Sequence, residues 1–293
     1  MSFKSALESG KFTVTAEVGP PKGTDIKKIL HEAGMLKGKV DALNVTDNQS
    51  AVMRINSMSF CKLLLDMGQE PILQMTCRDR NRIGLQSDLL GASILGIKNV
   101  LCMTGDHPNA GDHKEAKPVY DIESVQLLQV VDGLNNGRDL MGNDLQGATD
   151  YYQGAVVTPE ANPIEPQMMK FEKKVKAGAK FFQTQAIYDI DKFKVFMSDA
   201  RKFPVKILAG LVLLKSAGMA NFMNKFVPGI TVPQELIDEL KAAGKEKALD
   251  KGIDIMARHI RQLKDENICD GVHIMAIGAE DKVPAIMERA GLL

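Results

Sequence analysis

The stretch Val100-Leu101-Cys102-Met103-Thr104-Gly105-Asp106 decides how the rest of the chain is interpreted. An apolar run of strand length ends at Thr-Gly-Asp, and a loop rich in Gly, Asn, Asp and Pro follows. The pattern predicts a buried strand that carries the Asp106 carboxylate to the point where the backbone turns away, with Gly105 allowing close approach to a ligand. Alone, Asp106 fits a turn as well as a site, and only recurrence of the pattern along the chain distinguishes the two.

The same pattern, an apolar run that stops at polar or turn-forming residues and leads into a helical repeat, recurs along the whole chain. Strands are predicted at 12–18, 42–46, 71–76, 100–103, 152–157, 180–185, 205–211 and 270–275. Helices are predicted at 24–36, 55–67, 82–95, 122–134, 190–203 and 281–290. One further helix ends at Ala177-Gly178-Ala179, another runs from just after Lys215-Ser216 to residue 226, and two more lie within 233–266. Residues 104–118 and 135–150 are predicted to be loops.

The predicted strands are almost continuously apolar, which is typical of a parallel sheet that is buried on both faces. Eight strand–helix units in 293 residues favour an α/β protein with a single-domain (β/α)8 TIM barrel over residues 1–293. An open dinucleotide-binding or P-loop sheet is disfavoured, because neither GxGxxG nor GxxxxGK[ST] occurs.

Composition excludes several classes of function. The 37 basic and 37 acidic residues balance, so no overall field attracts nucleic acid or a membrane surface. The start of the chain has no apolar signal region, and no apolar stretch approaches the roughly 18 residues of a spanning helix, so we expect a cytoplasmic protein. The four cysteines form no CxxC, so no metal or iron–sulfur site is expected. His259, on a charged helix, is expected to be exposed.

The active site of a (β/α)8 barrel lies at the carboxyl ends of its strands. Glu17 and Asp106 end the first and fourth strands, which lie on opposite sides of such a barrel, so one carboxylate can hold a developing cation while the other moves a proton. A lysine-rich helix face follows the fifth strand; it is predicted to point outward, with Met168, Met169, Phe171 and Val175 inward. The other polar residues at strand ends are Thr46, Asp47, Asn48, Gln74, Thr76, Gly105, Glu160, Gln185, Lys215 and His273.

Seven short motifs in register on these strands together resemble a known family. They are Phe12 to Pro21 with Glu17 before Pro-Pro, Asn44-Val45-Thr46, Met75-Thr76-Cys77, Thr104-Gly105-Asp106, Pro159-Glu160, Ala177-Gly178-Ala179 and Thr184-Gln185. In this order and spacing they resemble the methylenetetrahydrofolate reductases of bacterial type, over essentially the whole chain.

The resemblance implies a flavin-containing barrel of one-carbon metabolism that reduces 5,10-methylenetetrahydrofolate to 5-methyltetrahydrofolate by ping-pong hydride transfer, or runs the reverse reaction. It implies that Glu17 is the general acid that helps to open the methylene bridge to a 5-iminium cation, and that Asp106 stabilises this cation. Substrate contacts are implied for Asp106, Gln185 and, on the seventh helix, Phe222 or Met223. Cofactor contacts are implied for Thr46, Asp47, Gln49, Gln74, Thr76, Thr104, Gly105, Asp106, Tyr120, Asp121, Thr158, Asn162, Gln167, Lys170, Lys173 and Lys174.

The chain departs from the family pattern in four places. Gln74 stands where the family often has His, Thr104 where it often has Arg, and Ala279 near the place of an expected Arg. The segment after Glu160 is shorter in the region that normally holds the adenine half of FAD, which keeps FMN open beside FAD.

The resemblance implies either NAD(P)H or a partner protein as electron donor. It favours a homo-oligomer or a complex with an electron-delivering or methyl-accepting subunit, a folate as the small-molecule substrate, and no nucleic-acid or membrane partner. Two other hypotheses remain: a non-redox pterin-binding barrel, such as a methyltransferase subunit, and a subunit whose activity depends on another chain.

Overall fold

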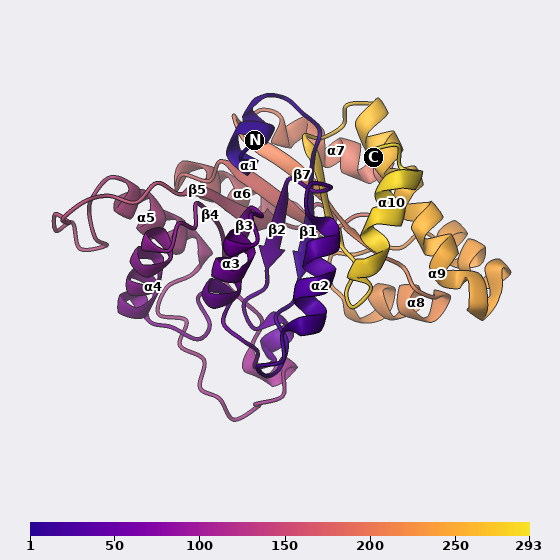
Figure 1. Ribbon diagram of the computed structural model, residues 1–293. Coiled ribbons are helices and arrows are strands. Elements are labelled where there is room, and N and C mark those ends of the chain that lie inside the picture. The colour runs from indigo at the N-terminus through magenta and orange to yellow at the C-terminus, as the bar shows by residue number, and fades with distance from the viewer.

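A computed structural model describes all 293 residues, and its centre is a closed parallel barrel. The strands follow one another around the barrel in chain order, and β8 pairs with β1 to close it. The strands are β1 (Thr13–Val18), β2 (Ala42–Val45), β3 (Pro71–Thr76), β4 (Asn99–Met103), β5 (Tyr152–Val157), β6 (Phe181–Ala186), β7 (Lys206–Val212) and β8 (Gly271–Met275). The predicted (β/α)8 barrel is therefore confirmed (Figure 1).

Helices surround the barrel and bury its outer face in a core cluster of 59 residues. Several helices begin at side-chain caps that the sequence displays: Asn81, for example, accepts hydrogen bonds from the amides of Ile83 and Gly84. The helices are α1 (Phe3–Glu8), α2 (Lys27–Leu36), α3 (Ser57–Asp66), α4 (Arg82–Ile94), α5 (Ser124–Asn135), α6 (Glu165–Lys176), α7 (Ile190–Ala200), α8 (Ala217–Phe226), α9 (Gln234–Asp265) and α10 (Val283–Arg289), with 3-10 turns η1 (Gln49–Ala51), η2 (Pro108–Ala110) and η3 (Glu280–Lys282).

Helix α1, which the sequence pattern did not predict, closes the end of the barrel opposite to the carboxyl ends of the strands. Phe3 is fully buried with the first residues of several strands, and its ring lies edge-on to Phe181 at 5.0 Å and to Tyr152 at 6.0 Å. In Figure 1 this helix lies at the top, and the arrows of β1 and β2 point away from it. The functional site must therefore lie at the other end.

We expect the substitution Phe3→Ala to lower the free energy of unfolding by about 3 kcal/mol, because it leaves a cavity at the closed end of the barrel. Phe222→Ala is the matched control, since Phe222 is 56% exposed and should change stability by less than about 1 kcal/mol. Urea unfolding of both variants measures the difference. Equal stability of the two variants would show that α1 does not plug the barrel.

Some local predictions were wrong. His259 is buried in α9 and not exposed, and burial lowers its pKa to about 4. Met169 is 62% exposed, and Lys174 is buried although the lysine face was predicted to point outward. Packing between helices covers His259 and Lys174, which a single-helix pattern assigns to solvent, and it leaves Met169 at the surface although the same kind of pattern assigns it to the core. The two helices predicted in 233–266 meet at Gly244, whose φ of 72° breaks the helical path of α9.

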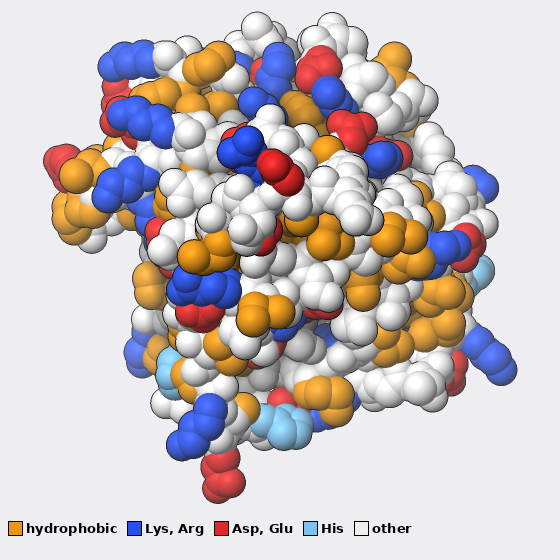
Figure 2. All heavy atoms as spheres, turned by 90° about the vertical axis from the view of Figure 1, so that its left-hand side faces the viewer, with side chains coloured by type: hydrophobic (Ala, Val, Ile, Leu, Met, Phe, Trp, Pro, Cys, Tyr) orange, Lys and Arg blue, Asp and Glu red, His pale blue; other side chains and the backbone are white.

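The outer surface mixes charge with apolar groups. On the side of α4 and α5, Figure 2 shows Lys and Arg interspersed with Asp, Glu and hydrophobic side chains, without a continuous field of one sign. No helix combines the length and apolar character that crossing a bilayer requires.

Candidate active site

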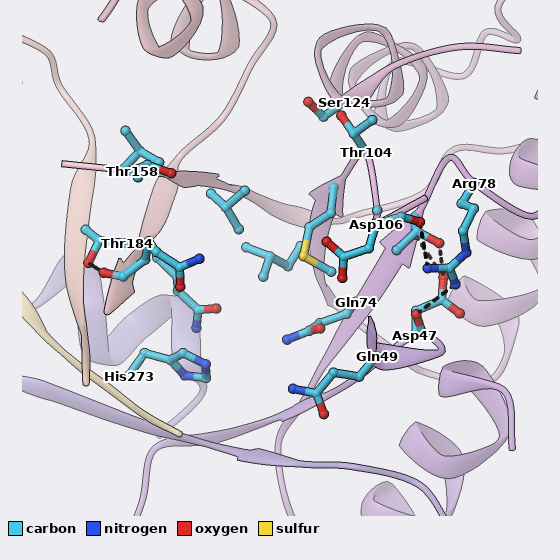
Figure 3. A pocket seen from close by; sticks show the side chains of 18 of the residues that line it. Asp47, Gln49, Gln74, Arg78, Thr104, Asp106, Ser124, Thr158, Thr184 and His273 are labelled. Carbon is cyan, nitrogen blue, oxygen red and sulfur yellow. Dashed lines mark hydrogen bonds between the residues drawn. The ribbon is translucent and has the colours of Figure 1, made fainter. Parts of the chain in front are cut away.

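A pocket of about 460 Å³ opens at the carboxyl ends of the strands (Figure 3). Only 5 of its 25 lining residues are hydrophobic, so its chemistry is polar. Its walls come from β1, β3, β4, β5, β6 and β8, from the loops that follow β2, β3, β4 and β5, from the first residue of α5 and from one face of α6. Glu17 and Asp106, predicted from two distant strands, line this same pocket.

Glu17 is held by amide donors from two neighbouring segments. Gln49 Nε2 donates to Glu17 Oε1 at 2.9 Å, and Gln74 Nε2 donates to Oε2 at 3.3 Å. His273 Nε2 lies 3.7 Å from the same Oε2 atom, and the Glu17 side chain is only 12% exposed. The carboxyl group is thus fixed in direction at the pocket wall, where it can give a proton to a bound molecule.

Asp106 lies beside these groups with its carboxylate free. No hydrogen bond or ion pair joins its side chain to the rest of the protein, and Figure 3 shows it pointing into the pocket. Its backbone is fixed, because Arg78 donates to the Asp106 carbonyl and Tyr120 donates to the Gly105 carbonyl. A negative charge without a protein partner at this place suits a ligand that carries positive charge.

Asp47 has a structural role in the pocket wall. Its Oδ2 atom accepts hydrogen bonds from the Thr76 amide at 2.8 Å and hydroxyl at 3.0 Å, and Arg80 pairs with the same oxygen. Arg78 is buried and donates to the carbonyls of Asn48 and Asp106, so it ties the loops after β2 and β4 together. These contacts set the shape of one side of the pocket.

Two lysines of α6 bring positive charge to the other side. Lys170 is paired with Glu123, whereas Lys174 is buried without a carboxylate partner and donates to the Val156 carbonyl at 2.7 Å. Burial, followed by the charge of Lys170, lowers the pKa of Lys174 from 10.5 to about 8. A buried cation without a counter-ion beside a pocket is suited to hold an anionic group.

This lowered pKa predicts that the ligand-free protein gains stability as pH rises above 8. The unfolded chain keeps the lysine proton up to about pH 10.5, while the folded chain releases it near pH 8, so unfolding takes up a proton between these values. From pH 8 to 9.5 the free energy of unfolding should rise by about 2 kcal/mol relative to Lys174→Met, which has no ionisable group. Urea unfolding across this range tests it, and parallel curves for the two proteins would contradict it.

The predicted site residues divide between the pocket and its surroundings. Lining it are Glu17, Asp47, Gln49, Gln74, Thr76, Thr104, Gly105, Asp106, Thr158, Gln167, Lys170, Lys174 and Gln185. Outside its lining are Thr46, Tyr120, Asp121, Asn162, Lys173, Phe222 and Met223.

The residues outside the pocket have other surroundings. Asp121 pairs with Arg82 at the surface, and Lys173 is exposed. Asn162 lines a second cavity of about 600 Å³ together with Glu160. Met223 is buried and receives a hydrogen bond from the Tyr188 hydroxyl.

Several lining residues were not predicted as site residues. Arg78 had a detectable signal, because it lies two residues after the end of β3. Gln183 had a weaker one, as a polar residue inside an apolar strand. The lining residues that were not predicted as site residues are Ser50, Arg78, Leu101, Met103, Ser124, Val156, Val157, Gln183, Thr184 and Met275.

A closed eight-stranded barrel with a polar pocket at the carboxyl ends of its strands is the architecture of the (β/α)8-barrel enzymes. The chain belongs to the methylenetetrahydrofolate reductase family, whose model matches residues 2–291.

The relatives are longer than this chain. A probable methylenetetrahydrofolate reductase (NADPH) of Caenorhabditis elegans is 24% identical over 81% of this chain and 35% of its own length. Methylenetetrahydrofolate reductase 1 of Schizosaccharomyces pombe is 22% identical over 97% of this chain and 46% of its own length. The chain thus spans about a third to a half of the length of these relatives.

A solved structure supports the fold. An uncharacterized protein from Clostridium thermocellum, described as binding two copies of 5-methyl-5,6,7,8-tetrahydrofolic acid, has a TM-score of 0.64 with 17% identity. The match covers 98% of this chain and 97% of that one.

Proposed function

We propose that this chain is a flavin-dependent reductase that converts 5,10-methylenetetrahydrofolate to 5-methyltetrahydrofolate, or catalyses the reverse reaction. The observation that carries the proposal is one pocket holding two carboxylates in different states, Glu17 fixed by amides and Asp106 free. The family match and the folate described in the Clostridium structure support the substrate class.

The pocket residues fit a flavin. Lys174, buried without a carboxylate partner, is suited to a phosphate, and Lys170 lies on the same helix. Gln49 and Gln74 supply amide groups that match the hydrogen-bonding edge of a flavin or pterin ring. When bound, the flavin supplies hydride transfer, which protein side chains cannot provide. We keep FAD and FMN as alternatives. Asn162 belongs to the segment after Glu160, which would hold the adenine half of FAD, and it lies in the separate cavity and not in the pocket.

The protein's own groups would act on the folate. Glu17 gives a proton to N10 as the bond between N10 and the bridging carbon breaks, with the electron pair passing to N10. The positive charge that forms at N5 and the bridging carbon is stabilised by the unpaired carboxylate of Asp106. Gln185, which lines the same pocket, is positioned to hydrogen-bond the pterin.

The electron donor is proposed to be NAD(P)H or a partner protein. Names of related reductases include both NADPH and NADH. The chain spans only part of those relatives, so the donor and the subunit composition of this protein are proposed separately from theirs.

Binding of flavin to the purified chain tests the function. The chain should bind FAD or FMN at one per chain, give a visible flavin spectrum, and be reoxidised by 5,10-methylenetetrahydrofolate after reduction with dithionite. Chemical reduction removes the question of the natural donor. A chain that binds 5-methyltetrahydrofolate in calorimetry but neither flavin would overturn the proposal in favour of a non-redox pterin-binding barrel.

A further inference from the structure

A column of buried polar side chains lies inside the barrel beneath the pocket. Gln183 of β6 and Asn44 of β2 exchange amide hydrogen bonds across the interior at 2.7 and 3.0 Å. Gln183 Nε2 also donates to Thr15 Oγ1 at 3.3 Å. Branched apolar residues usually fill this space, and buried polar groups are costly unless they are satisfied. The column therefore calls for an explanation beyond packing.

His273 connects this column to Glu17. The register of β1 and β8 places Thr15 beside His273, and Thr15 Oγ1 lies 3.0 Å from His273 Nδ1. The other ring nitrogen, Nε2, lies 3.7 Å from Glu17 Oε2. The His273 side chain is only 4% exposed, yet it lines the pocket (Figure 3).

His273 is the one basic side chain within ion-pair distance of Glu17. The amide groups of Gln49 and Gln74 orient Glu17 but are neutral and cannot protonate it. The pocket's other charged side chains come from the loops after β2, β3 and β4 and from α6, and neither carboxylate among them pairs with the His273 ring. They are Asp47, Arg78, Asp106, Lys170 and Lys174.

Thr15 can determine which nitrogen of the His273 ring carries a proton. Its oxygen accepts from Gln183, and its single proton can go either to the Val272 carbonyl at 3.4 Å or to His273 Nδ1. When the hydroxyl donates to Val272, Nδ1–H of the ring donates to Thr15. Nε2 of the neutral ring then faces Glu17 without a proton and can accept one, and the protonated ring can pass its Nε2 proton to Glu17. The direction of the Thr15 hydroxyl therefore decides which ring nitrogen carries the proton in the neutral ring.

We propose that His273 is a proton-relay residue that reloads Glu17, with Thr15 setting its tautomer. This inference rests on the proposed function, in which the Glu17 O–H bond breaks as the N10–H bond forms. The Nε2–H bond of the protonated His273 ring then breaks as a new Glu17 Oε2–H bond forms. The neutral ring is protonated again at Nε2 by hydronium or a buffer acid of the solution, which reaches it through the pocket that it lines and leaves as its conjugate base. Because His273 acts through Glu17, it is a positioning residue and not itself a catalytic residue.

Two variants separate a relay from a structural contact. His273→Gln keeps an amide that can bond to Thr15 but cannot carry a proton, whereas His273→Ala opens space that free imidazole can fill. In the flavin-loaded protein, both should lower kcat for methylenetetrahydrofolate at least tenfold, with KM within about threefold and a changed pH profile. Imidazole should restore at least part of the rate of the Ala variant. A native rate and pH profile in His273→Gln would overturn the relay.

A second measurement needs neither cofactor nor turnover. In the flavin-free chain labelled with 15N-histidine, the Nε2 signal of His273 should shift in Glu17→Gln, and the Nδ1 signal should shift in Thr15→Val. Glu165→Gln, on the outer surface, is the control and should leave both signals in place. An unchanged Nε2 signal in Glu17→Gln would overturn the relay even if the reductase activity is found. A shifted signal in a chain without folate turnover would support the coupling while the proposed function fails.

Discussion

Glu17→Gln should lower the rate of methylenetetrahydrofolate reduction at least about a hundredfold, because the amide cannot deliver the proton that opens the methylene bridge. The substitution preserves shape. The new amide oxygen can accept from one of Gln49 and Gln74, and the new NH2 group can donate to the oxygen of the other once that amide turns over, so the pocket should keep its form. Rapid-mixing experiments that follow oxidation of the pre-reduced flavin by the folate measure this step directly. Reduction of the flavin by its donor should stay close to the native rate.

The matched control is Glu160→Gln, another carboxyl group near the carboxyl ends of the strands that lies in the separate cavity. It should change the folate step by less than about threefold. If Glu17→Gln turns over the folate at the native rate, Glu17 is not the acid. If both variants lose activity equally, the effect reflects the loss of negative charge around the barrel mouth and not proton delivery.

Asp106→Asn should slow the same step by about a hundredfold, because a neutral amide no longer stabilises the developing cation. The Asp106 side chain has no hydrogen bond or ion pair within the protein, so little stability should be lost with its charge. The expected pattern is a reduced maximal rate of flavin oxidation with a smaller change in the folate concentration needed for half-maximal rate.

Asp112→Asn controls for loop order in this experiment. Asp112 lies on the same loop but pairs with Lys22 and accepts a hydrogen bond from the Met53 amide at 3.3 Å. Its substitution disturbs the loop without touching the pocket lining. Unchanged kinetics in Asp106→Asn would remove this carboxylate from the mechanism, and equal losses in both variants would assign the effect to loop position.

Some site features were predictable because they are local in the chain. Asp106 follows an apolar run directly, and Glu17 precedes Gly19 and Pro20, so each marks the carboxyl end of a strand. In a barrel all such ends meet at one face, which is why both residues line one pocket. The roles given to the individual residues stay predictions until the variants are measured.

Other features depended on contacts that no local pattern contains. The helical repeat of 165–176 does not distinguish Lys174 from Lys173, yet the first is buried at the pocket and the second is exposed. The helical pattern also failed for Met169 in α6 and for His259 in α9. Burial of one helix position depends on how that helix rotates against its neighbours, and this is set by the complete packing of the core.

The sequence by itself determined the class of fold, because eight apolar runs that alternate with helical repeats leave few other ways to bury a parallel sheet. It also placed the polar strand ends at one face. Only the tertiary structure decided that Thr15 and His273, 258 positions apart, lie in contact and that His273 faces Glu17. The physical reason is barrel closure: the register between the first and last strands follows from the geometry of the whole sheet and is encoded in neither strand alone.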